Sequence, residues 1–231
     1  MTISTLSGLY TGRVAPDYAK GRASAIDKQP APGEVSVDRL GLTGDEQADP
    51  DNHGGPERAL LHYCLDHYAW WQTEHPAQAT RFEPPGFGEN LASRDMDEHS
   101  VHIGDVYRIG SVRVQVSQPR TPCWKLDVRF DIPGLARRVQ ETGRCGWFYR
   151  VLEPGTLTAG DTIERLERLP ESLSIAAAMA AVYQRPNHQH LQQLADCETL
   201  APNWRDKARR KRRGAADASS PQRLTGEPPS A

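Results

Sequence analysis

The chain has 231 residues, and its 28 Lys and Arg against 30 Asp and Glu give a formal net charge of −2 at pH 7. This length is enough for one full domain with its own core and for a smaller appendage. The near balance of charge argues against wholesale binding of nucleic acid or membrane, although cations concentrate in "KARRKRR" at residues 207–213.

Targeting signals and paired cysteines are both missing from the sequence. No apolar run approaches the roughly 18 to 20 residues that cross a bilayer, and residues 1–13 lack the basic start and apolar core of a signal peptide. We therefore expect a cytoplasmic protein.

The four cysteines include no C-x-x-C pair for zinc, iron–sulfur or dithiol chemistry, so a special thiol among them must act singly.

Residues 6–117 read mostly as strand and turn. Valines at 112, 114 and 116 alternate with polar residues, which is the period of a half-buried strand. "IGD" at residues 103–105 and "AGD" at residues 159–161 are turn signals before short β-like runs. Short strands broken by Gly, Pro and Asp favour a closed or partly closed barrel over a βαβ sheet, and no G-x-G-x-x-G follows a strand.

Helical patterns interrupt and then follow the strands. Residues 56–75 predict a helix with Pro56 in its first turn and Cys64, Tyr68 and Trp71 on one face, so Cys64 is expected in the core. A second helix is expected over residues 132–143, ending at Gly143.

The character of the sequence changes after residue 169. Residues 172–184, 187–197 and 201–212 predict three short helices, with Ser172 or Ser174 as the first N-cap. From residue 214 onward the composition is small, polar and rich in Pro and Ser, which predicts disorder. The expected organisation is a mainly β domain over residues 1–168, a three-helix module over residues 169–213 and a disordered tail over residues 214–231.

The stretch "SQPRTPCWKLD" at residues 117–127 gives Cys123 a stiff and cationic setting. Pro119 and Pro122 restrict the backbone and remove two N–H donors. Arg120 and Lys125 would favour the thiolate, the form that binds a metal or attacks an electrophile. A buried structural cysteine is an equally good interpretation of the pattern alone.

The stretch "DNHGGPERALLHY" at residues 51–63 is a candidate phosphate site. Gly54 and Gly55 before a helix would let backbone N–H groups approach an anion, and Arg58 could bind a phosphate with two hydrogen bonds. The alternative is a plain glycine turn entering a helix, with His53 as its cap.

The stretch "PPGFGENLAS" at residues 84–93 is a third candidate. Gly86 and Gly88 permit close backbone approach, Glu89 could act as an acid or base, and the amide of Asn90 could read the edge of a heterocycle. Standing alone, this segment would be a loop with no assigned role.

Taken together, these stretches carry a resemblance to a known family. "HGGPERALLHY", "FGENL", "VHIGDVYRIG" and "SQPRTPCWKLD", in that order, resemble the MOSC domain, named for the C-terminal domain of molybdenum cofactor sulfurase. The following "TGRCGWFYRVLEPGTLTAGDTI" and the three helices are similar to its YiiM-like branch. The resemblance runs from about Tyr10 to Arg212, and it implies a MOSC-type β-barrel with a few peripheral helices that binds the molybdenum cofactor.

The resemblance also implies roles for individual residues. Cys123 matches the cysteine that is a molybdenum ligand in the family, and a soft thiolate suits a sulfur-coordinated metal. Cys145 has no ligand role in that pattern and is expected to be structural. Glu89 and Asp45 are candidates for proton transfer, but each could equally stabilise a turn. The residues expected around the pterin and its phosphate are His53, Gly54, Gly55, Arg58, Gly88, Asn90, Arg120 and Lys125.

The activity implied by the resemblance is reduction of N-hydroxylated compounds, such as 6-N-hydroxylaminopurine, to amines. The sequence has no evident flavin, haem or iron–sulfur motif, so electrons are expected from an external flavin or iron–sulfur reductase, with the three-helix module as its docking candidate. Two alternatives stay open. One is a carrier that holds the cofactor or sulfur without turnover, and the other is a nucleic-acid binder using residues 207–213, a run that more often is a solvated helix end.

Overall fold

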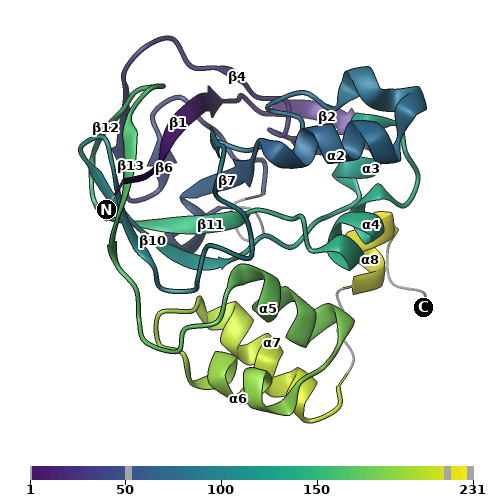
Figure 1. The fold of residues 1–231 in the computed structure, drawn as a ribbon. Coiled ribbons are helices and arrows are strands. Elements are labelled where there is room, and N and C mark those ends of the chain that lie inside the picture. Colours follow the sequence, from purple (N-terminus) through teal and green to yellow (C-terminus); the bar gives the residue numbers. More distant parts are fainter. Residues whose placement is uncertain (1, 50–53, 216–219, 228–231) are drawn as a thin grey trace.

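The computed structural model describes residues 2–49, 54–215 and 220–227. A closed seven-stranded β-barrel forms its larger part, in the order β13-β9-β10-β11-β7-β8-β1, and β13 pairs back onto β1 (Figure 1). The barrel strands are β1 (Thr2–Thr11), β7 (Leu60–Cys64), β8 (Leu91–Ser93), β9 (Val106–Ile109), β10 (Val112–Pro119), β11 (Trp147–Glu153) and β13 (Thr162–Glu167). The predicted mainly β barrel is confirmed.

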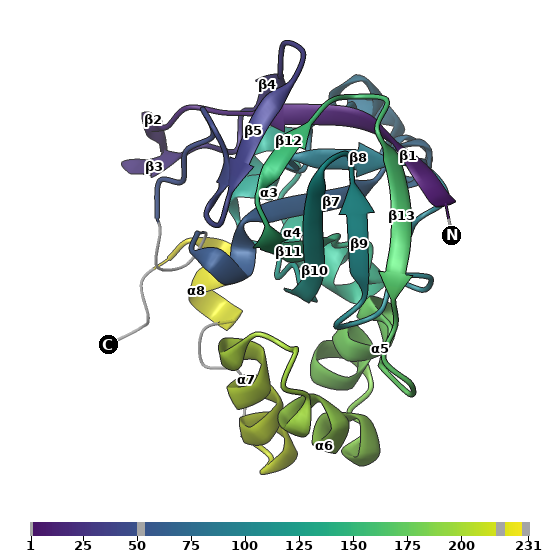
Figure 2. The same ribbon diagram turned by 90° about the vertical axis from the view of Figure 1, so that its left-hand side faces the viewer.

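Shorter strands extend the barrel. β4 (Gln29–Pro30) pairs with the end of β1. A three-stranded sheet and a two-stranded sheet lie beside it (Figure 2). These sheets consist of β12 (Gly155–Leu157), β5 (Val35–Asp38) and β6 (Gly41–Leu42), and of β2 (Ala15–Ala19) and β3 (Arg22–Ser24).

The predicted strand and turn signals match the observed elements. Val112, Val114 and Val116 of β10 are fully buried, whereas Arg113 and Gln115 between them are half-buried, as a strand with one face on the core requires.

Each of the two glycine–aspartate turns is closed by its aspartate. Asp105 accepts a hydrogen bond from the His102 N–H (3.0 Å), and Asp161 accepts one from the Thr158 N–H (2.7 Å). β9 and β13 begin directly after these turns. Both predicted turns are therefore confirmed.

The helix predicted over residues 56–75 is wrong in its first half. The chain makes a single 3₁₀ turn, η1 (Pro56–Arg58), then the strand β7, and becomes helical only in α2 (Asp66–Glu74). All five β7 residues are buried, because β7 lies between β11 and β8 in the barrel wall. A short run that is apolar on both faces has no period to separate strand from helix. Cys64 lies in the core, as expected, but on a strand.

Further helices cover one side of the barrel. They are η2 (Pro76–Arg81), α3 (Lys125–Phe130) and α4 (Leu135–Thr142), which lie with α2 in Figure 1. α4 ends at Gly143, which takes the left-handed conformation (φ 75°) that favours glycine. Between these helices and the barrel, the rings of Trp71, Phe82, Phe87 and Phe130 form a packed aromatic core.

The predicted three-helix module is present below the barrel (Figures 1 and 2). It consists of α5 (Ile175–Met179) with its continuation η3 (Ala180–Gln184), α6 (His188–Asp196) and α7 (Pro202–Arg212). Ser174, not Ser172, caps α5 and accepts a hydrogen bond from the Ala177 N–H (3.1 Å). Backbone hydrogen bonds such as Ala201 N–H to the Ser117 carbonyl (2.9 Å) join the module to the barrel.

The predicted disorder of residues 214–231 is wrong for residues 220–227. A short helix, α8 (Ser220–Thr225), lies beside α4 (Figure 1), and its Leu224 is buried. Composition missed this helix because its stability comes from packing on distant residues, not from its own sequence. Residues 216–219 and 228–231 lie outside the described residues.

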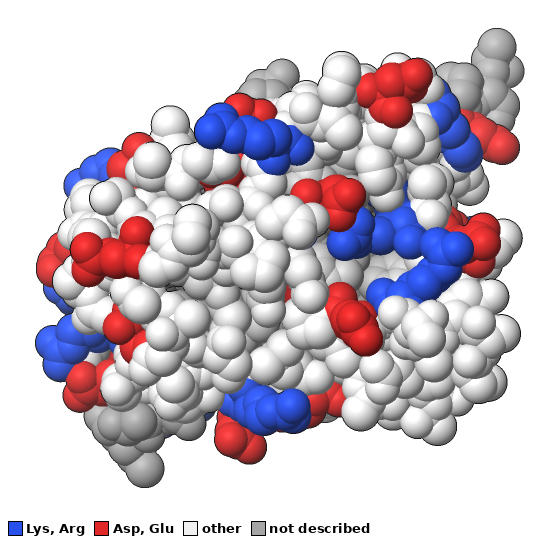
Figure 3. Space-filling model, turned by 90° about the horizontal axis from the view of Figure 1, so that it is seen from above, with Lys and Arg blue, Asp and Glu red and all other residues white. Residues whose placement is uncertain are grey.

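The surface seen from above carries both signs of charge. Lys and Arg are interspersed with Asp and Glu, and several cationic side chains gather around a hollow at one end (Figure 3). None of the helices that the structure describes has the length and apolar character required to span a bilayer.

Candidate functional site

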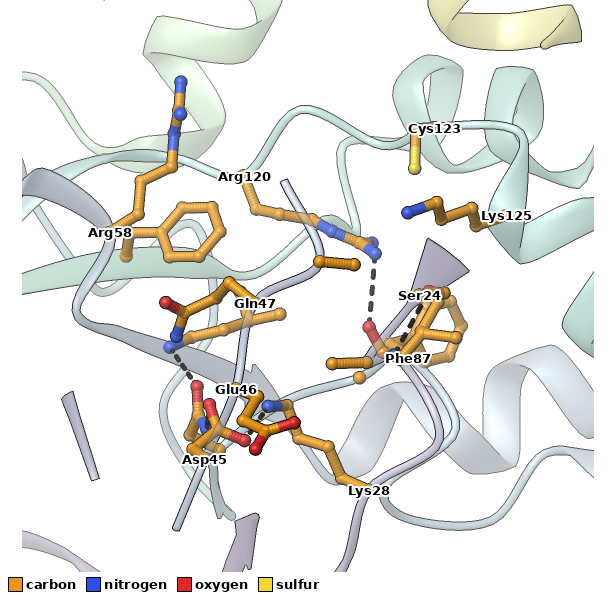
Figure 4. A pocket seen from close by; sticks show the side chains of 17 residues that line it. Ser24, Lys28, Asp45, Glu46, Gln47, Arg58, Phe87, Arg120, Cys123 and Lys125 are labelled. Carbon is orange, nitrogen blue, oxygen red and sulfur yellow. Dashed lines mark hydrogen bonds and ion pairs between the residues drawn. The ribbon is translucent and has the colours of Figure 1, made fainter. Parts of the chain in front are cut away.

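A cleft opens on the barrel where several distant segments meet (Figure 4). The residues that line the cleft are Ser24, Ala25, Ile26, Lys28, Asp45, Glu46, Gln47, Ala48, Arg58, Leu61, Phe87, Gly88, Asn90, Arg120, Cys123, Lys125 and Phe148. Seven of the predicted site residues are therefore brought together: Asp45, Arg58, Gly88, Asn90, Arg120, Cys123 and Lys125.

Cys123 lies in the loop between β10 and α3 and is partly exposed. Its sulfur and the side-chain nitrogens of Arg120 and Lys125 point toward the same space (Figure 4). The loop is stiff because Pro119 ends β10 and Pro122 precedes the cysteine. Reactive cysteines are typically found in such partly exposed, cationic surroundings.

Arg120 is a buried cation with an unused donor. Its Nη2 donates to the Phe87 carbonyl (3.1 Å), but its Nη1 is buried and makes no hydrogen bond to any described residue. A buried donor without an acceptor is costly, so native structures seldom contain one that has no ligand or water partner. Within the described residues, this nitrogen is therefore a donor that is free to bind an acceptor in the cleft.

Lys125 and Arg58 add charge to the cleft. Lys125 Nζ donates to the Ala23 carbonyl (2.9 Å), which anchors a side chain that is only 9% exposed. Partial burial lowers the pKa of the Arg58 guanidinium. In Figure 4 this guanidinium points away from the space that Arg120 and Lys125 face. Of the cations labelled in Figure 4, Arg120 and Lys125 are the two that face the thiol.

Asp45 and Asn90 hold the cleft wall together. Asp45 accepts hydrogen bonds from the Gly12 N–H (2.8 Å), Asn90 Nδ2 (2.9 Å) and the buried ammonium of Lys28. Asn90 Oδ1 in turn accepts from the Leu61 N–H (3.1 Å). Since these polar groups are engaged within the protein, the contacts favour the structural alternative for Asp45 over proton transfer.

Glu89 does not line the cleft. It is fully buried and turned toward Tyr68, whose hydroxyl donates to its Oε1 (2.5 Å), while the Phe87 N–H donates to its Oε2 (3.1 Å). Burial raises the pKa of Glu89 to about 7, and the Tyr68 hydrogen bond opposes this shift. Its hydrogen bond to the Phe87 N–H links it to a lining residue, whose ring stacks on Tyr63 (4.2 Å between centroids). These contacts make Glu89 a support for the Phe87 backbone.

The glycine-rich stretches behave differently from one another. Gly88 has a positive φ of 75°, and a Cβ there would lie 2.8 Å from Ile26 Cγ1, so the wall needs glycine. Gly54 and Gly55 are absent from the cleft lining, and one 3₁₀ turn replaces the helix whose N-terminus was expected to bind an anion. The predicted helix start is wrong there, and so short a turn lacks an aligned dipole, whereas binding of a phosphate by this segment stays a prediction. His53 lies outside the described residues.

The sequence interpretation missed several lining residues. Lys28 is the most consequential, because it is 6% exposed and pairs with Asp45 inside the wall. Burial lowers the pKa of Lys28, and the Asp45 carboxylate opposes the shift. Nothing in "IDKQP" marks a buried lysine. Glu46 and Gln47 directly follow Asp45, so proximity in sequence could have suggested them.

The chain belongs to the MOSC domain proteins, in the branch with a YiiM-like helical domain. The MOSC domain matches residues 49–164, and the YiiM-like, 3-alpha helix domain matches residues 173–215. The latter match corresponds to the module of α5, α6 and α7. The recognised family is therefore confirmed over both parts of the chain.

Relatives of this chain support the same assignment. It is 38% identical to Protein YiiM of Escherichia coli strain K12, over 95% of this chain and 97% of that protein. It is 39% identical to a protein named Reductase from Gibberella moniliformis, over 82% of this chain but only 34% of that longer protein. It is also 36% identical to the uncharacterized protein YflK of Bacillus subtilis strain 168, over 79% of this chain and 81% of that protein.

Solved structures share the whole fold. The crystal structure of YiiM from Escherichia coli aligns with a TM-score of 0.80 at 32% identity, covering 96% of this chain and 98% of that one. YiiM from Geobacillus stearothermophilus aligns with a TM-score of 0.76 at 28% identity, covering 90% of this chain and 99% of that one.

Proposed function

We propose that this protein is an oxidoreductase that holds the molybdenum cofactor in the cleft and reduces N-hydroxylated compounds to amines. The observation that carries the proposal is that one cleft contains the Cys123 thiol and Arg120, whose Nη1 has no acceptor among the described residues. MOSC membership and the relative named Reductase support an oxidoreductase. Hydroxylamino derivatives of purines, such as 6-N-hydroxylaminopurine, are the substrate class.

The residues present fit such a cofactor. A thiol offers the soft ligand that a sulfur-coordinated metal prefers, and the cations Arg120, Lys125, Lys28 and Arg58 outnumber the two lining carboxylates, Asp45 and Glu46. Arg120 Nη1 would donate to an anionic group of the pterin or its phosphate. Gly88 lets the cleft wall pack closely against Ile26. When bound, the cofactor supplies the two-electron redox chemistry.

The overall reaction takes R–NH–OH, two electrons and two protons to R–NH₂ and water. Cys123 acts as the ligand, Arg120 and Lys125 favour its thiolate and the anionic cofactor, and Pro119 and Pro122 limit movement of the loop. Glu89 holds Phe87 in place from behind the wall. The cleft's partial enclosure restricts water around the reacting group.

The electrons come from another protein, a flavin or iron–sulfur reductase. The relative named Reductase is much longer than its matched part, because this chain covers 34% of it. We infer that a reductase partner meets this chain at a specific surface, and the module of α5, α6 and α7 is the candidate. An artificial donor such as a viologen dye needs no such surface.

The test compares molybdenum content and dye-driven reduction of 6-N-hydroxylaminopurine in three full-length proteins. Cys123→Ser should lose reduction, whereas Cys197→Ala, a matched change outside the cleft, should retain it. Equal turnover by Cys123→Ser and the unsubstituted protein contradicts the proposal. Bound molybdenum without any reduction by the unsubstituted protein would instead indicate a cofactor carrier.

A further inference from the structure

The C-terminal helix α8 returns to the loop that carries Cys123. The guanidinium of Arg223 donates from Nη1 to the Pro122 carbonyl, and the Trp124 N–H donates to the Arg223 carbonyl (2.9 Å). Both sequence neighbours of Cys123 are thus hydrogen-bonded to the same residue. Arg223 Nη2 also donates to Gln140 Oε1 on α4 (2.7 Å), and the guanidinium carbon lies 5.6 Å from the ring centroid of Tyr183 in η3.

Further contacts seat α8 on the tryptophan that follows Cys123. Gly226 is buried against the Trp124 ring, where a Cβ would lie 2.8 Å from Trp124 Cδ2. Lys20 Nζ lies 5.3 Å from the centroid of the same ring and donates to the Thr225 carbonyl (2.7 Å). Leu224 is 7% exposed. α8 is therefore packed in place by apolar, cation–π and hydrogen-bonding contacts together.

The prolines restrict the dihedral angles of the loop, but they do not attach it to its neighbours. Proline has no N–H, so Pro119 and Pro122 cannot donate hydrogen bonds that would tie the loop to a neighbouring strand. The Pro122 carbonyl and the Trp124 N–H both bond to Arg223, which lies 101 residues after Pro122 in the sequence. The Arg120 N–H to Gly146 carbonyl bond (3.0 Å) holds the start of the loop, and α8 holds the two residues on either side of the thiol.

We propose that α8 is a clamp on the Cys123 loop and that Arg223 is a positioning residue for Cys123. The catalytic consequence rests on the proposed function, but the clamp itself concerns only the thiol. Loosening it should expose the thiol and misplace it relative to the cleft. The accessibility of the thiol can therefore be measured separately from catalysis.

The first measurement is the alkylation rate of each cysteine by iodoacetamide, followed by peptide mass spectrometry. It uses full-length protein made in a host that cannot synthesise the molybdenum cofactor. Losing a hydrogen bond from a charged donor should raise local opening, so Arg223→Ala should alkylate at Cys123 about tenfold faster or more. Arg212→Ala removes an exposed cation of α7 and is the matched control, with no change expected.

Two features separate a clamp from general loss of structure. Buried Cys64 and Cys145 should stay unreactive in Arg223→Ala, and Arg223→Lys should restore much of the protection, because an ammonium can still donate to the Pro122 carbonyl. Lys20→Ala changes an exposed side chain outside the core and should raise Cys123 alkylation by about threefold, because it weakens the seat of α8. Unchanged Cys123 rates in both Arg223→Ala and Lys20→Ala would overturn the clamp.

The second measurement is the kinetics of dye-driven hydroxylamine reduction by the cofactor-loaded protein. Because Arg223 is absent from the cleft lining, Arg223→Ala should lower kcat by about tenfold and leave KM within about twofold. If the unsubstituted protein reduces no hydroxylamine, the proposed function fails while the alkylation result still decides the clamp. Faster alkylation with an unchanged kcat would overturn the positioning role of Arg223.

Discussion

Cys123 and Cys145 stand in the same half of the sequence but in opposite surroundings. Cys145 is fully buried, its thiol contacts the Gly146 carbonyl (3.2 Å), and burial raises its pKa well above the usual range. Cys123 is partly exposed in a cleft that also contains Arg120 and Lys125. Both segments are family-like in sequence, so the difference shows that the surroundings, more than the motif, decide which thiol can react.

The largest effect is expected when the same substitution, cysteine to alanine, is made at both positions. Cys123→Ala should abolish dye-driven reduction and change the free energy of unfolding by no more than about 0.5 kcal/mol, since the site is partly exposed. Cys145→Ala should keep kcat and lower the free energy of unfolding by about 1 to 2 kcal/mol, because it leaves a small cavity. Kinetics and urea unfolding of both variants provide the check. Loss of turnover in well-folded Cys145→Ala would contradict the contrast.

The next largest effect is expected on molybdenum content when Arg120, which lines the cleft, is replaced. Removing a charge-assisted contact to the cofactor should lower the molybdenum content of Arg120→Met by about tenfold or more. The same change removes a buried, incompletely satisfied cation, so the cofactor-free protein should lose no more than about 1 kcal/mol of stability. Elemental analysis tests the molybdenum content, and urea unfolding tests the stability. An unchanged molybdenum content would show that Arg120 Nη1 does not hold the cofactor.

Glu89 is a buried group, like Cys145, and its contribution to stability should depend on pH. Its pKa is raised by burial from 4.5 to about 7 in the folded protein, so the folded state binds more protons than the unfolded state between these values. Stability attributable to Glu89 is therefore lost as pH rises from about 4.5 to about 7, by up to about 3 kcal/mol.

The measurement for Glu89 is urea unfolding of the unsubstituted protein and Glu89→Gln across this pH window. The unsubstituted protein should lose stability relative to Glu89→Gln as the pH increases. Glutamine is the matched control because it keeps the shape of the side chain but cannot titrate. A difference between the two proteins that is independent of pH would show that Glu89 keeps one protonation state.

The smallest effect is expected from the cations of α7, far from either cysteine. Arg209 pairs with Asp206 (2.9 Å) and donates to the Ala195 carbonyl (3.0 Å), which are contacts of a solvated helix end. We expect no DNA binding at about 0.15 M salt, and no change in turnover for Arg212→Ala. Salt-sensitive DNA binding that Arg212→Ala weakens would support the nucleic-acid alternative.

Much of the fold could be predicted because its signals are local. The alternation of Val112, Val114 and Val116, the aspartates that close two turns and Gly143 at the end of α4 each act within a few residues. β7 was missed because its burial arises from pairing with β11 and β8, which no short window of sequence contains. α8 was missed for the same reason, since its partners are Pro122, Trp124 and Gln140.

The site was predictable at the level of segments and less so for side chains. The motif around Cys123 correctly placed the thiol beside Arg120 and Lys125. Whether Glu89 faces the cleft or the core depends on the direction of one side chain, and the hydroxyl of Tyr68 determined it. Lys28 could be recognised only from its burial against Asp45, which requires the tertiary structure.

The closure of the barrel has a consequence for how the protein folds. β1 supplies the first strand in sequence, yet it pairs with β13, where Ser4 lies opposite Ile163 and Thr5 opposite Thr162. The barrel therefore cannot close during synthesis until residues 162–164 have left the ribosome, and β1 must wait with one edge unpaired. Such contacts between distant positions slow folding, because loop-closure entropy is lost before the pairing forms. We expect the later helical module to become compact on a shorter timescale than the barrel that precedes it.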